Sequence, residues 1–560
     1  MDQGRINLDW CLSLLQGLAG AGLRRVVISP GSRNTPLTLA TVLHPRIKHD
    51  TVVDERSAAF FALGIARETA EPVALVCTSG SAVANWLPAV VEANRQQLPL
   101  ILLSADRPWE LQRCQANQTI DQIHLFGNQV RAFHQLPPAE ASESGLRRLQ
   151  SLGRELIREA SMPRGGPVHV NLPLREPLVP RELPQSLPAA NAEKPMSPQL
   201  GLSEEAVRML AASLTAEQGI IVCGPCADCL AVLELAARLD CPVLADPLSG
   251  LRFASKASSV IVHYDLFLRA ASQRKALSAG WVLQFGGTPV SKALQEYLNA
   301  QLAVPHWWID ASGRNMDRPN VQVETLQVSP QVVCGQLLSM DLRPSARGWQ
   351  SKWLELDKQV EQRMQQQVLP LEAKIIRCVL EAVPAQSLLF SGNSMVVRFL
   401  DAFSGGLNKE ISVRGNRGAS GIDGNLSTFA GIASAFQGSG KVVGIVGDLT
   451  LFHDLNALSL AREQDMTLVL LNNNGGGIFD HLPQHDLPAY EACWRTPVEL
   501  DHEHIAAAFG IAFSRVENET AFADALSRAL SQPGMQLIEV LIDSACSNER
   551  YRNIMGQWAN

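Results

Sequence analysis

Long apolar runs, a strong charge bias and a secretion signal are all missing from this sequence of 560 residues. No apolar stretch approaches the ~20 residues that cross a bilayer, so we expect no membrane span. The 48 lysines and arginines against 55 aspartates and glutamates give a net charge of −7, which argues against nucleic acid or an anionic membrane as the main partner. The first ten residues lack the basic start and apolar core of a signal peptide, and we expect a cytoplasmic protein.

A disulfide framework is also missing, because the eleven cysteines are odd in number and scattered. We expect free thiols packed as small apolar residues. Cys223, Cys226 and Cys229 have the spacing of a metal site, with Cys241 further on. Cys241, the candidate fourth ligand, lies twelve residues after Cys229, whereas such metal sites have about four. We therefore favour an interpretation without a metal, in which a strand turns at residues 224–225 into a helix over 227–239.

What the sequence does contain is enough apolar material for several cores, at 46% hydrophobic residues. Short Val/Ile/Leu-rich runs alternate with helical patterns, which is typical of parallel sheets covered on both faces. We predict three doubly wound α/β domains, at residues 1–180, 199–345 and 352–560, with a proline-rich linker over 173–198. The predicted strands are residues 26–29, 72–78, 98–104, 167–171, 219–223, 242–245, 260–263, 281–285, 307–310, 387–390, 441–446, 467–471 and 536–542. The clearest predicted helices are residues 7–20, 55–69 and 353–367.

Two strand ends in the last domain carry metal-binding chemistry. One strand ends in Gly447-Asp448, and the next ends in three asparagines and three glycines at residues 472–477. Because ligands of such sheets lie beyond the carboxyl ends of the strands, we expect these two loops to be neighbours. A carboxylate, an amide oxygen and a backbone carbonyl suit Mg²⁺ bound to phosphates, which glycine N–H groups can approach. The alternative is a helix cap at Asp448 followed by an ordinary turn.

This pair of motifs resembles the diphosphate site of thiamine-diphosphate enzymes, although Leu449 stands where the family usually has glycine. Those enzymes also need a glutamate in a separate α/β domain, and Glu55 lies at a predicted strand-to-helix turn in the first domain. Taken alone, Glu55 would be interpreted as a first-turn helix residue stabilised by the helix dipole.

Further motifs narrow the resemblance to one family. SPGSRNTPLT (29–38), SADRP (104–108), ANQ (116–118), GNS (392–394) with Arg398, and NRGASGIDG (416–424) closely resemble the 2-succinyl-5-enolpyruvyl-6-hydroxy-3-cyclohexene-1-carboxylate synthases. These are enzymes of menaquinone and phylloquinone biosynthesis, and the resemblance covers nearly the whole chain. It implies a pyrimidine-binding domain, a central domain and a diphosphate domain, in that order.

The resemblance also implies a reaction and its residues. Thiamine diphosphate with Mg²⁺ or Mn²⁺ would support decarboxylation of 2-oxoglutarate and conjugate addition of the succinyl-semialdehyde carbanion to isochorismate. Asp448, Asn473 and Gly475 would hold the metal, and Ile422 would bend the cofactor. The implied cofactor contacts are Glu55, Ser32, Gly31, Ile422, Gly447, Asp448, Leu449, Asn473, Gly475, Ile478 and Phe479. The implied catalytic and substrate residues are Glu55, Ser32, Arg33, Arg107, Gln118, Lys292, Ser394, Arg398, Arg417, Ile478 and Phe479.

The charges point the same way, because two dianionic substrates need several fixed cations and arginine pairs with carboxylates in bidentate fashion. Each of these arginines taken separately could equally be a solvated or salt-bridged surface residue. Lys292 is the weakest of these assignments, since Ala293 stands where some relatives have a second basic residue. Two alternatives remain open: an acetolactate-synthase-like or benzoylformate-decarboxylase-like 2-oxoacid lyase on the same fold, and a catalytically silent cofactor-binding subunit. The resemblance implies a homodimer or a dimer of dimers, with Glu55 and Asp448 meeting across the subunit interface.

Overall fold

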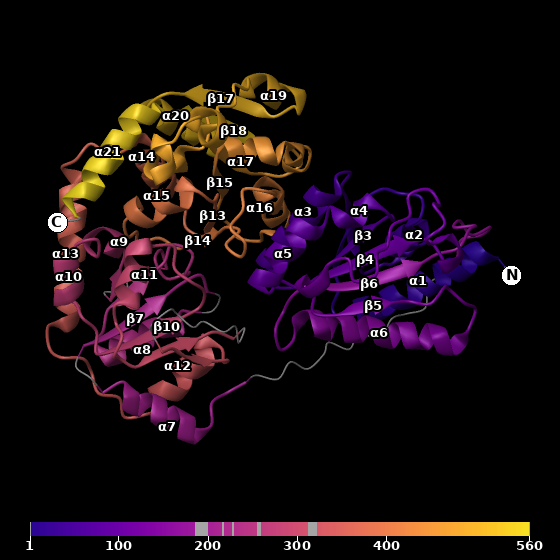
Figure 1. The fold of residues 1–560 in the computed structure, drawn as a ribbon, viewed down its shortest axis with the longest axis horizontal. Coiled ribbons are helices and arrows are strands. Elements are labelled where there is room, and N and C mark those ends of the chain that lie inside the picture. Colours follow the sequence, from indigo (N-terminus) through magenta and orange to yellow (C-terminus); the bar gives the residue numbers. More distant parts are fainter. Residues whose placement is uncertain are drawn as a thin grey trace. The chain divides into compact units, whose positions relative to one another are not determined.

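The computed structural model describes residues 2–184, 200–215, 218–226, 229–254, 259–311 and 322–558. These residues form three six-stranded sheets, and every strand pair in them is parallel (Figure 1). The predicted fold class, three doubly wound α/β sheets, is confirmed. Strand β6 ends at Pro173, the first residue of the predicted linker. The linker lies partly outside the described residues, since residues 185–199 are not among them.

The chain groups into two compact units that are not continuous in sequence. The first consists of Met1–Ser197, Asn416–Gln437 and Phe452–Gln464. The second consists of Pro198–Gly415, Gly438–Leu451 and Asp465–Asn560. The last third of the chain therefore contributes segments to both units.

The first unit contains the first sheet, in strand order β2-β1-β3-β4-β6-β5. Its inner strands are buried on both faces, which explains their runs of Val, Ile and Leu. Helices α1, α2 and α6 cover one face, and α3 and α5 cover the other (Figure 1). The strands are β1 Arg25–Ile28, β2 Lys48–Thr51, β3 Val73–Cys77, β4 Leu100–Asp106, β5 Phe133–Gln135 and β6 Val168–Pro173. The helices are α1 Gln3–Gly20, α2 Thr35–Leu43, α3 Glu55–Thr69, α4 Ser81–Ala84, α5 Leu87–Gln96 and α6 Glu143–Ser161.

Helix α3 is packed tightly against α16 (Asn425–Ala435) within the same unit. A Cβ on Gly64 would lie 2.1 Å from the Thr428 carbonyl oxygen, and one on Gly431 would lie 2.1 Å from that of Phe61. No side chain fits at either position, so glycine is what permits the two backbones to approach this closely.

The second unit contains the other two sheets. The second sheet has the order β12-β11-β10-β7-β8-β9, with α8 and α12 on one face and α9 and α11 on the other. Its strands are β7 Gly219–Cys223, β8 Val243–Ala245, β9 Val260–Ile261, β10 Trp281–Phe285, β11 His306–Ile309 and β12 Glu324–Leu326. Its helices are α7 Glu204–Ser213, α8 Ala231–Leu239, α9 Tyr264–Phe267, α10 Ala271–Ala276, α11 Lys292–Asn299, α12 Pro330–Leu338 and α13 Trp349–Gln365.

The third sheet has the order β14-β13-β15-β16-β18-β17, and α14, α15 and α20 pack on one of its faces. Its strands are β13 Ser387–Ser391, β14 Ile411–Arg414, β15 Val442–Gly447, β16 Thr467–Asn472, β17 Ala512–Val516 and β18 Gln536–Leu541. The accompanying helices are α14 Leu371–Ala382, α15 Met395–Phe403, α19 His502–Ala508, α20 Glu519–Ser531 and α21 Ser544–Gln557. Of α17, Asp448–His453, residues 448–451 belong to the second unit, and α18, Leu458–Ala461, belongs to the first unit.

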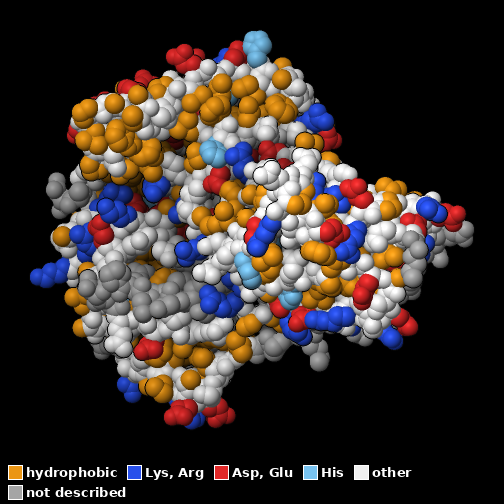
Figure 2. All heavy atoms as spheres, turned by 45° about the vertical axis from the view of Figure 1, so that its right-hand side comes forward, with side chains coloured by type: hydrophobic (Ala, Val, Ile, Leu, Met, Phe, Trp, Pro, Cys, Tyr) orange, Lys and Arg blue, Asp and Glu red, His pale blue; other side chains and the backbone are white. Residues whose placement is uncertain are grey.

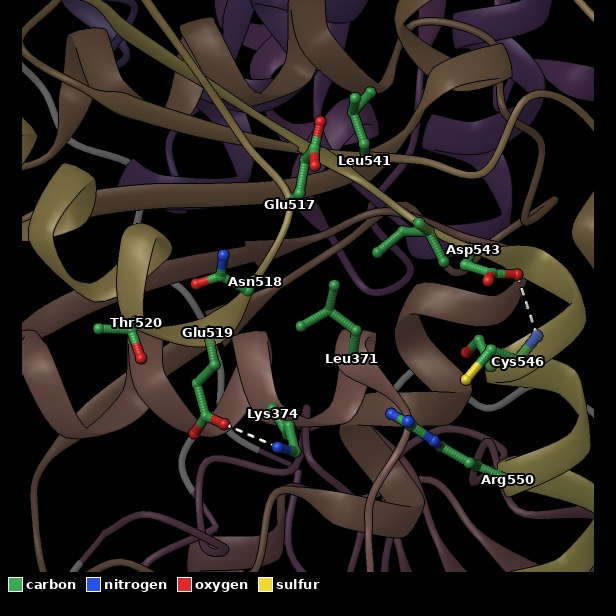
Figure 3. Close-up of a pocket in the computed structure, with 12 residues that line it drawn as sticks. Leu371, Lys374, Glu517, Asn518, Glu519, Thr520, Leu541, Asp543, Cys546 and Arg550 are labelled. Atoms are coloured by element: carbon green, nitrogen blue, oxygen red, sulfur yellow. Dashed lines mark hydrogen bonds and ion pairs between the residues drawn. The ribbon is translucent and has the colours of Figure 1, made fainter.

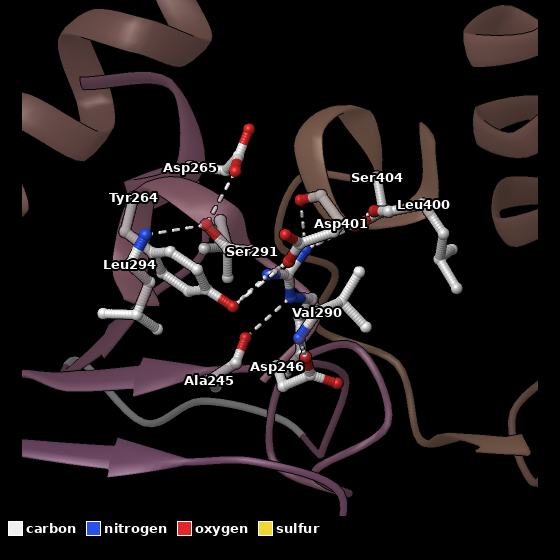
Figure 4. A network of polar contacts seen from close by, with 12 residues as sticks. Ala245, Asp246, Tyr264, Asp265, Val290, Ser291, Leu294, Leu400, Asp401 and Ser404 are labelled. Carbon is white, nitrogen blue, oxygen red and sulfur yellow. Dashed lines mark hydrogen bonds and ion pairs between the residues drawn. The ribbon is translucent and has the colours of Figure 1, made fainter. Parts of the chain in front are cut away.

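A buried arginine joins the parts of the second unit that carry the second and third sheets (Figure 4). Arg252 donates to the Asp401 carboxylate at 2.8 Å, to the Asp401 carbonyl at 2.6 Å and to the Ala245 carbonyl at 2.9 Å. Tyr264 donates to the same carboxylate at 3.1 Å. Because both charged side chains are removed from water, the pair depends on this complete set of hydrogen bonds.

Two expectations concern the cysteines and the membrane. The expectation of free thiols is wrong for Cys226 and Cys229, which form a disulfide. The two residues are three apart in sequence, with Cα atoms 6.2 Å apart, a separation that permits a disulfide. None of the described helices is long and apolar enough to span a bilayer. Lysine and arginine side chains are interspersed with acidic ones on the face drawn in Figure 2, in line with the small net charge.

Candidate cofactor and substrate site

The predicted metal-binding loops are neighbours in the second unit. Strands β15 and β16 pair in parallel, with Gly447 opposite Leu471, so Asp448 and the asparagine–glycine turn emerge at the same edge. The backbone N–H of Gly475 donates to the Asp448 carboxylate at 2.6 Å. The juxtaposition expected from the sequence is therefore confirmed.

The surroundings of Asp448 fit a cation with bound phosphates. The side chain is buried, and burial raises its pKa although hydrogen bonds from Gly475 and Leu449 act in the opposite direction. A bound cation would stabilise this buried carboxylate. A Cβ on Gly447 would meet no atom of the described residues within 4 Å, so there is open space at the residue that precedes Asp448. Oxygen donors beside a glycine-lined space suit Mg²⁺ and a diphosphate.

The three asparagines have different roles. Asn472 donates to Glu539 at 2.7 Å and accepts the N–H of Asn474 at 3.0 Å, so it organises the turn. The side chain of Asn474 accepts the N–H of Val498 at 3.1 Å. Asn473 lies beside Gly477, where a Cβ would be 2.2 Å from its amide nitrogen. The role of Asn473 as a metal ligand, which the resemblance implies, stays a prediction.

Arg495 holds this turn in place, and sequence reasoning missed it. Its buried guanidinium donates to the Asn473 carbonyl, to Ser544 Oγ at 2.7 Å and to Asp480 at 2.9 Å. Its own carbonyl accepts the N–H of Gly476 at 2.6 Å. A Cβ on Gly475 would lie 2.2 Å from that same carbonyl oxygen, and the φ of Gly475 is +122°. Glycine is therefore required there for two independent reasons.

Four of the remaining predicted residues of the second unit lie on short elements near strand ends. Ser394 follows β13 with a φ of +65°, and Arg398 one turn later is exposed and donates to the Ser394 carbonyl. Ile478 and Phe479 are half-buried on a 3₁₀ turn, Gly477–His481.

Lys292 contacts none of the other predicted site residues among the interactions of the described residues. It is the first residue of α11, its side chain is 89% exposed, and its ammonium lies 3.8 Å from Glu296 one turn away. The neighbouring Ala293 is buried in the core of the second sheet, where a second basic side chain would be costly.

Glu55 lies in the first unit as the first residue of α3. The cap of this helix is Asp54, whose carboxylate accepts the N–H groups of Arg56 and Ser57 at 2.9 and 3.2 Å. Glu55 is therefore an acidic residue of the first helical turn, where the helix dipole stabilises its charge, and its contact with a cofactor stays a prediction. The negative charge of Glu55 contributes to raising the pKa of the Cys77 thiol, after the larger effect of burial, which places Glu55 near the end of β3.

Arg33 and Arg107 lie near each other in the first unit. Burial lowers the pKa of Arg107, and the positive charge of Arg33 lowers it further. Arg33 is buried and donates to the Leu174 carbonyl at 2.9 Å and to Glu176 at 2.7 Å. Its Nε is buried without a hydrogen-bond partner among the described residues. Two adjacent guanidinium groups with an unsatisfied donor suit an anionic ligand.

Ser79 connects two of the predicted substrate residues, although the sequence interpretation did not include it. Arg107 donates to Ser79 Oγ, Gln118 donates to the Ser79 carbonyl at 3.0 Å, and Ser79 Oγ donates to the Gln118 carbonyl at 3.1 Å. The signal that could have found it is the Thr78-Ser79-Gly80 sequence directly after a buried strand. Gly31 and Ser32 are exposed in the loop after β1.

The NRGASGIDG loop belongs to the first unit, where α5 fixes it. The buried carboxylate of Glu92 accepts the N–H groups of Gly418 and Ala419 at 2.8 and 2.6 Å. Arg417 and Ile422, both half-buried, lie on either side of these anchored amides. The loop is thus held by its backbone at Gly418 and Ala419.

A cavity of about 720 Å³ beside α14, α20 and α21 contains none of the predicted site residues. Two of its charged groups already pair with each other: Lys374 and Glu519 point toward each other and lie 2.8 Å apart (Figure 3). Size alone would make it a candidate, but its lining lacks the donor set assembled at Asp448. Glu55 and Asp448 belong to different units, and their meeting remains a prediction.

Comparisons with known proteins agree with this chemistry. Residues 13–125 match the N-terminal thiamine pyrophosphate binding domain of thiamine pyrophosphate enzymes, residues 191–391 their middle domain, and residues 414–540 their C-terminal thiamine pyrophosphate binding domain. A Dechloromonas aromatica protein named 2-succinyl-5-enolpyruvyl-6-hydroxy-3-cyclohexene-1-carboxylate synthase is 40% identical over 550 residues, covering 96% of this chain and 99% of that protein.

Proteins of the same name from Oceanobacillus iheyensis and Geobacillus kaustophilus are each 38% identical. They cover 97% and 98% of this chain, and the chain covers 96% and 97% of them. The chain belongs to the family of 2-succinyl-5-enolpyruvyl-6-hydroxy-3-cyclohexene-1-carboxylate synthases.

Proposed function

We propose that this chain is the synthase that decarboxylates 2-oxoglutarate and adds the resulting carbanion to isochorismate, with thiamine diphosphate as cofactor. The observation that carries the proposal is the Asp448 carboxylate, buried at the end of β15 and bonded at 2.6 Å to the N–H of Gly475. This is a ready-made position for a divalent cation that binds a diphosphate.

On the diphosphate side, Asp448, Asn473 and the Gly475 carbonyl would hold Mg²⁺ or Mn²⁺. Gly447 and Leu449 would flank the diphosphate, and Ile422 would give the cofactor apolar support. When bound, thiamine diphosphate would supply the electron sink for decarboxylation. Glu55 would hydrogen-bond the pyrimidine ring and hold a proton there.

On the substrate side, cations recognise the two dianions. Arg33 and Arg107 are supported by their proximity and by the buried, unpartnered Nε of Arg33. Gln118 is placed beside Arg107 through Ser79. Arg398, Arg417 and Lys292 supply further charges, and Gly31, Ser32, Ser394, Ile478 and Phe479 line the pocket and exclude water from the reacting carbanion.

The proposal also includes the domain boundaries, the oligomeric state, the location in the cell and the pathway. The pyrimidine, central and diphosphate domains span residues 1–180, 199–345 and 352–560. The protein is a cytoplasmic homodimer or dimer of dimers that has no nucleic-acid partner, and Glu55 of one subunit meets Asp448 of the other. The product enters menaquinone or phylloquinone biosynthesis.

The test is CO₂ release from 2-oxoglutarate and from pyruvate, each with and without added thiamine diphosphate, and product formation with isochorismate. We expect release that depends on 2-oxoglutarate and on the cofactor. Glu55→Gln should keep the fold and bind metal but lose most activity, because an amide is a poor proton partner. Robust turnover of pyruvate would favour the alternative, an acetolactate-synthase-like or benzoylformate-decarboxylase-like lyase. A silent wild-type protein that still binds cofactor would favour the non-catalytic subunit.

A further inference from the structure

The loop between β7 and α8 gathers three cysteines outside the residues that we assign to cofactor and substrate. Cys223 ends β7, Cys226 lies in the loop, and Cys229 lies just before α8. Their three sulfur atoms lie within 4.8 Å of one another. Cys226 and Cys229 are joined by a disulfide, and Cys223 is free.

The two bonded sulfurs differ in their access to solvent. Cys226 is half-buried, whereas Cys229 is 3% exposed. A small thiolate arriving from solution therefore reaches the Cys226 sulfur first. Cys223 is fully buried, and burial raises its pKa strongly, with Asp246 and Cys334 adding to the effect. Cys223 stays protonated at neutral pH and does not compete as a nucleophile.

Cys229 is the sulfur that leaves when Cys226 is attacked. Its carbonyl accepts the N–H of Val232 at 2.9 Å, so it lies at the start of α8, a helix of nine residues. Attack on Cys226 with departure of Cys229 is thus favoured by the difference in access.

The backbone on the strand side of the disulfide is anchored by contacts that do not involve it. The N–H of Gly224 donates to the Phe285 carbonyl at 2.9 Å, and that of Gly287 donates to the Pro225 carbonyl at 2.8 Å. A Cβ on Gly224 would lie 1.8 Å from the Gly287 carbonyl oxygen, so this turn has no room to shift. Cys226 is held on one side by this turn and Cys229 on the other by α8, which keeps the thiols close after reduction.

We propose that Cys226 and Cys229 form a reversible thiol–disulfide exchange site for low-molecular-weight thiols. A thiolate bonds to Cys226 Sγ as the Cys226–Cys229 bond breaks, and Cys229 leaves as a thiolate that takes up a proton. A second thiol attacks the mixed disulfide at the sulfur of the first and releases Cys226, which is protonated in turn. The protein disulfide gains two electrons and two protons, and two small thiols are oxidised to their disulfide.

The test uses the full-length protein with Cys114→Ser, Cys378→Ser, Cys493→Ser and Cys546→Ser, because these exposed or half-buried free thiols would also react. The protein is equilibrated with reduced and oxidised glutathione at a series of ratios, quenched with acid and alkylated in denaturant. Peptide mass spectrometry should show two thiols that appear and disappear together with the ratio, at Cys226 and Cys229. Labelling of Cys223, Cys241 and Cys334 should stay constant. A pair that stays fully oxidised or fully reduced at every ratio would overturn the proposal.

Single variants in the same background test which sulfur is attacked. With Cys229→Ser, the remaining Cys226 should form a mixed disulfide with oxidised glutathione at least about tenfold faster than Cys229 does in Cys226→Ser, because of its access to solvent. Equal rates would contradict the assignment of Cys226 as the attacked sulfur. The wild-type titration stands by itself if either variant fails to fold.

Discussion

Replacing Arg495 should weaken cofactor binding although this residue is not expected to touch the cofactor. In Arg495→Met the apolar chain fills much of the same volume, but the donors to the Asn473 carbonyl, Ser544 and Asp480 are lost. Asp480 keeps hydrogen bonds from Tyr490 and from Asn548, the latter at 2.7 Å, which limits the loss of folding free energy. We therefore expect less than the ~3–5 kcal/mol of a fully orphaned buried charge.

The larger effect should fall on metal and cofactor affinity. The guanidinium of Arg495 holds the carbonyl of Asn473, whereas the main-chain carbonyl of residue 495, which accepts the N–H of Gly476, is kept in the variant. Removing a group that orients a metal ligand typically weakens metal binding about 10- to 100-fold. By the relation between Kd and free energy, this is roughly 1.4–2.7 kcal/mol.

Titration calorimetry with thiamine diphosphate and Mg²⁺ measures the effect, after circular dichroism has shown that the variant is folded. Lys374→Met is the matched control, since it removes a cation that pairs with Glu519 in the same domain, in the cavity of Figure 3. Ser544→Ala, which removes one donor to the Asn473 carbonyl at 2.9 Å, should give a smaller loss of the same kind. A folded Arg495→Met with the Kd of the control would refute the reasoning.

Three further predictions concern the rest of the chain. Arg252→Met should lower the free energy of unfolding in urea by about 3–5 kcal/mol, because it leaves the Asp401 carboxylate buried without its cation. The double variant Arg252→Met with Asp401→Leu should recover most of this loss. Equal free energies of unfolding for the single and the double variant would contradict the prediction. Burial lowers the pKa of His263, but Asp357 and Glu361 raise it by more. The stability that its charged form contributes is complete below the unfolded pKa of about 6.5 and is lost as the pH rises through the higher folded pKa. In His263→Gln, the slope of unfolding free energy against pH should therefore flatten above pH about 6.5. Ser79→Ala should raise KM for one substrate about 5- to 100-fold through Arg107 and Gln118 and leave cofactor Kd unchanged, and an unchanged KM would show that Ser79 does not position them.

Position in the sheet separates most of the strands that the sequence patterns predicted from those they missed, although the edge strand β9 was also predicted. Every inner strand of the three sheets was predicted, because burial on both faces leaves a continuous apolar run. The missed strands β2, β5, β12, β14 and β17 all lie at sheet edges. The sequence of β2, Lys-His-Asp-Thr, contains no large apolar residue, and three of its four residues are exposed. An edge strand forms because it hydrogen-bonds to the strand beside it, and its own sequence carries no pattern that identifies this partner.

The candidate site divides in a similar way. Residues that directly follow a predicted strand, such as Asp448 and Asn473, could be placed because parallel strands bring their carboxyl ends together. Arg495 and Glu92 could not, because each acts on a loop that is distant in sequence and nothing near either residue marks the partner. Arg33 was predicted to bind substrate, with a solvated or salt-bridged residue as the alternative, and the structure shows Glu176 as its partner.

The glycine-mediated crossing of α3 and α16 has a consequence for synthesis of the protein on the ribosome. Gly64 packs against the backbone at Thr428, so one face of the first unit is covered by a segment that is translated much later. Until Asn416–Gln437 has emerged, this face of α3 stays exposed, and contacts of such long sequence separation form slowly. A fragment ending at the linker should therefore be prone to aggregate, and an intact chain should complete its first unit only near the end of translation.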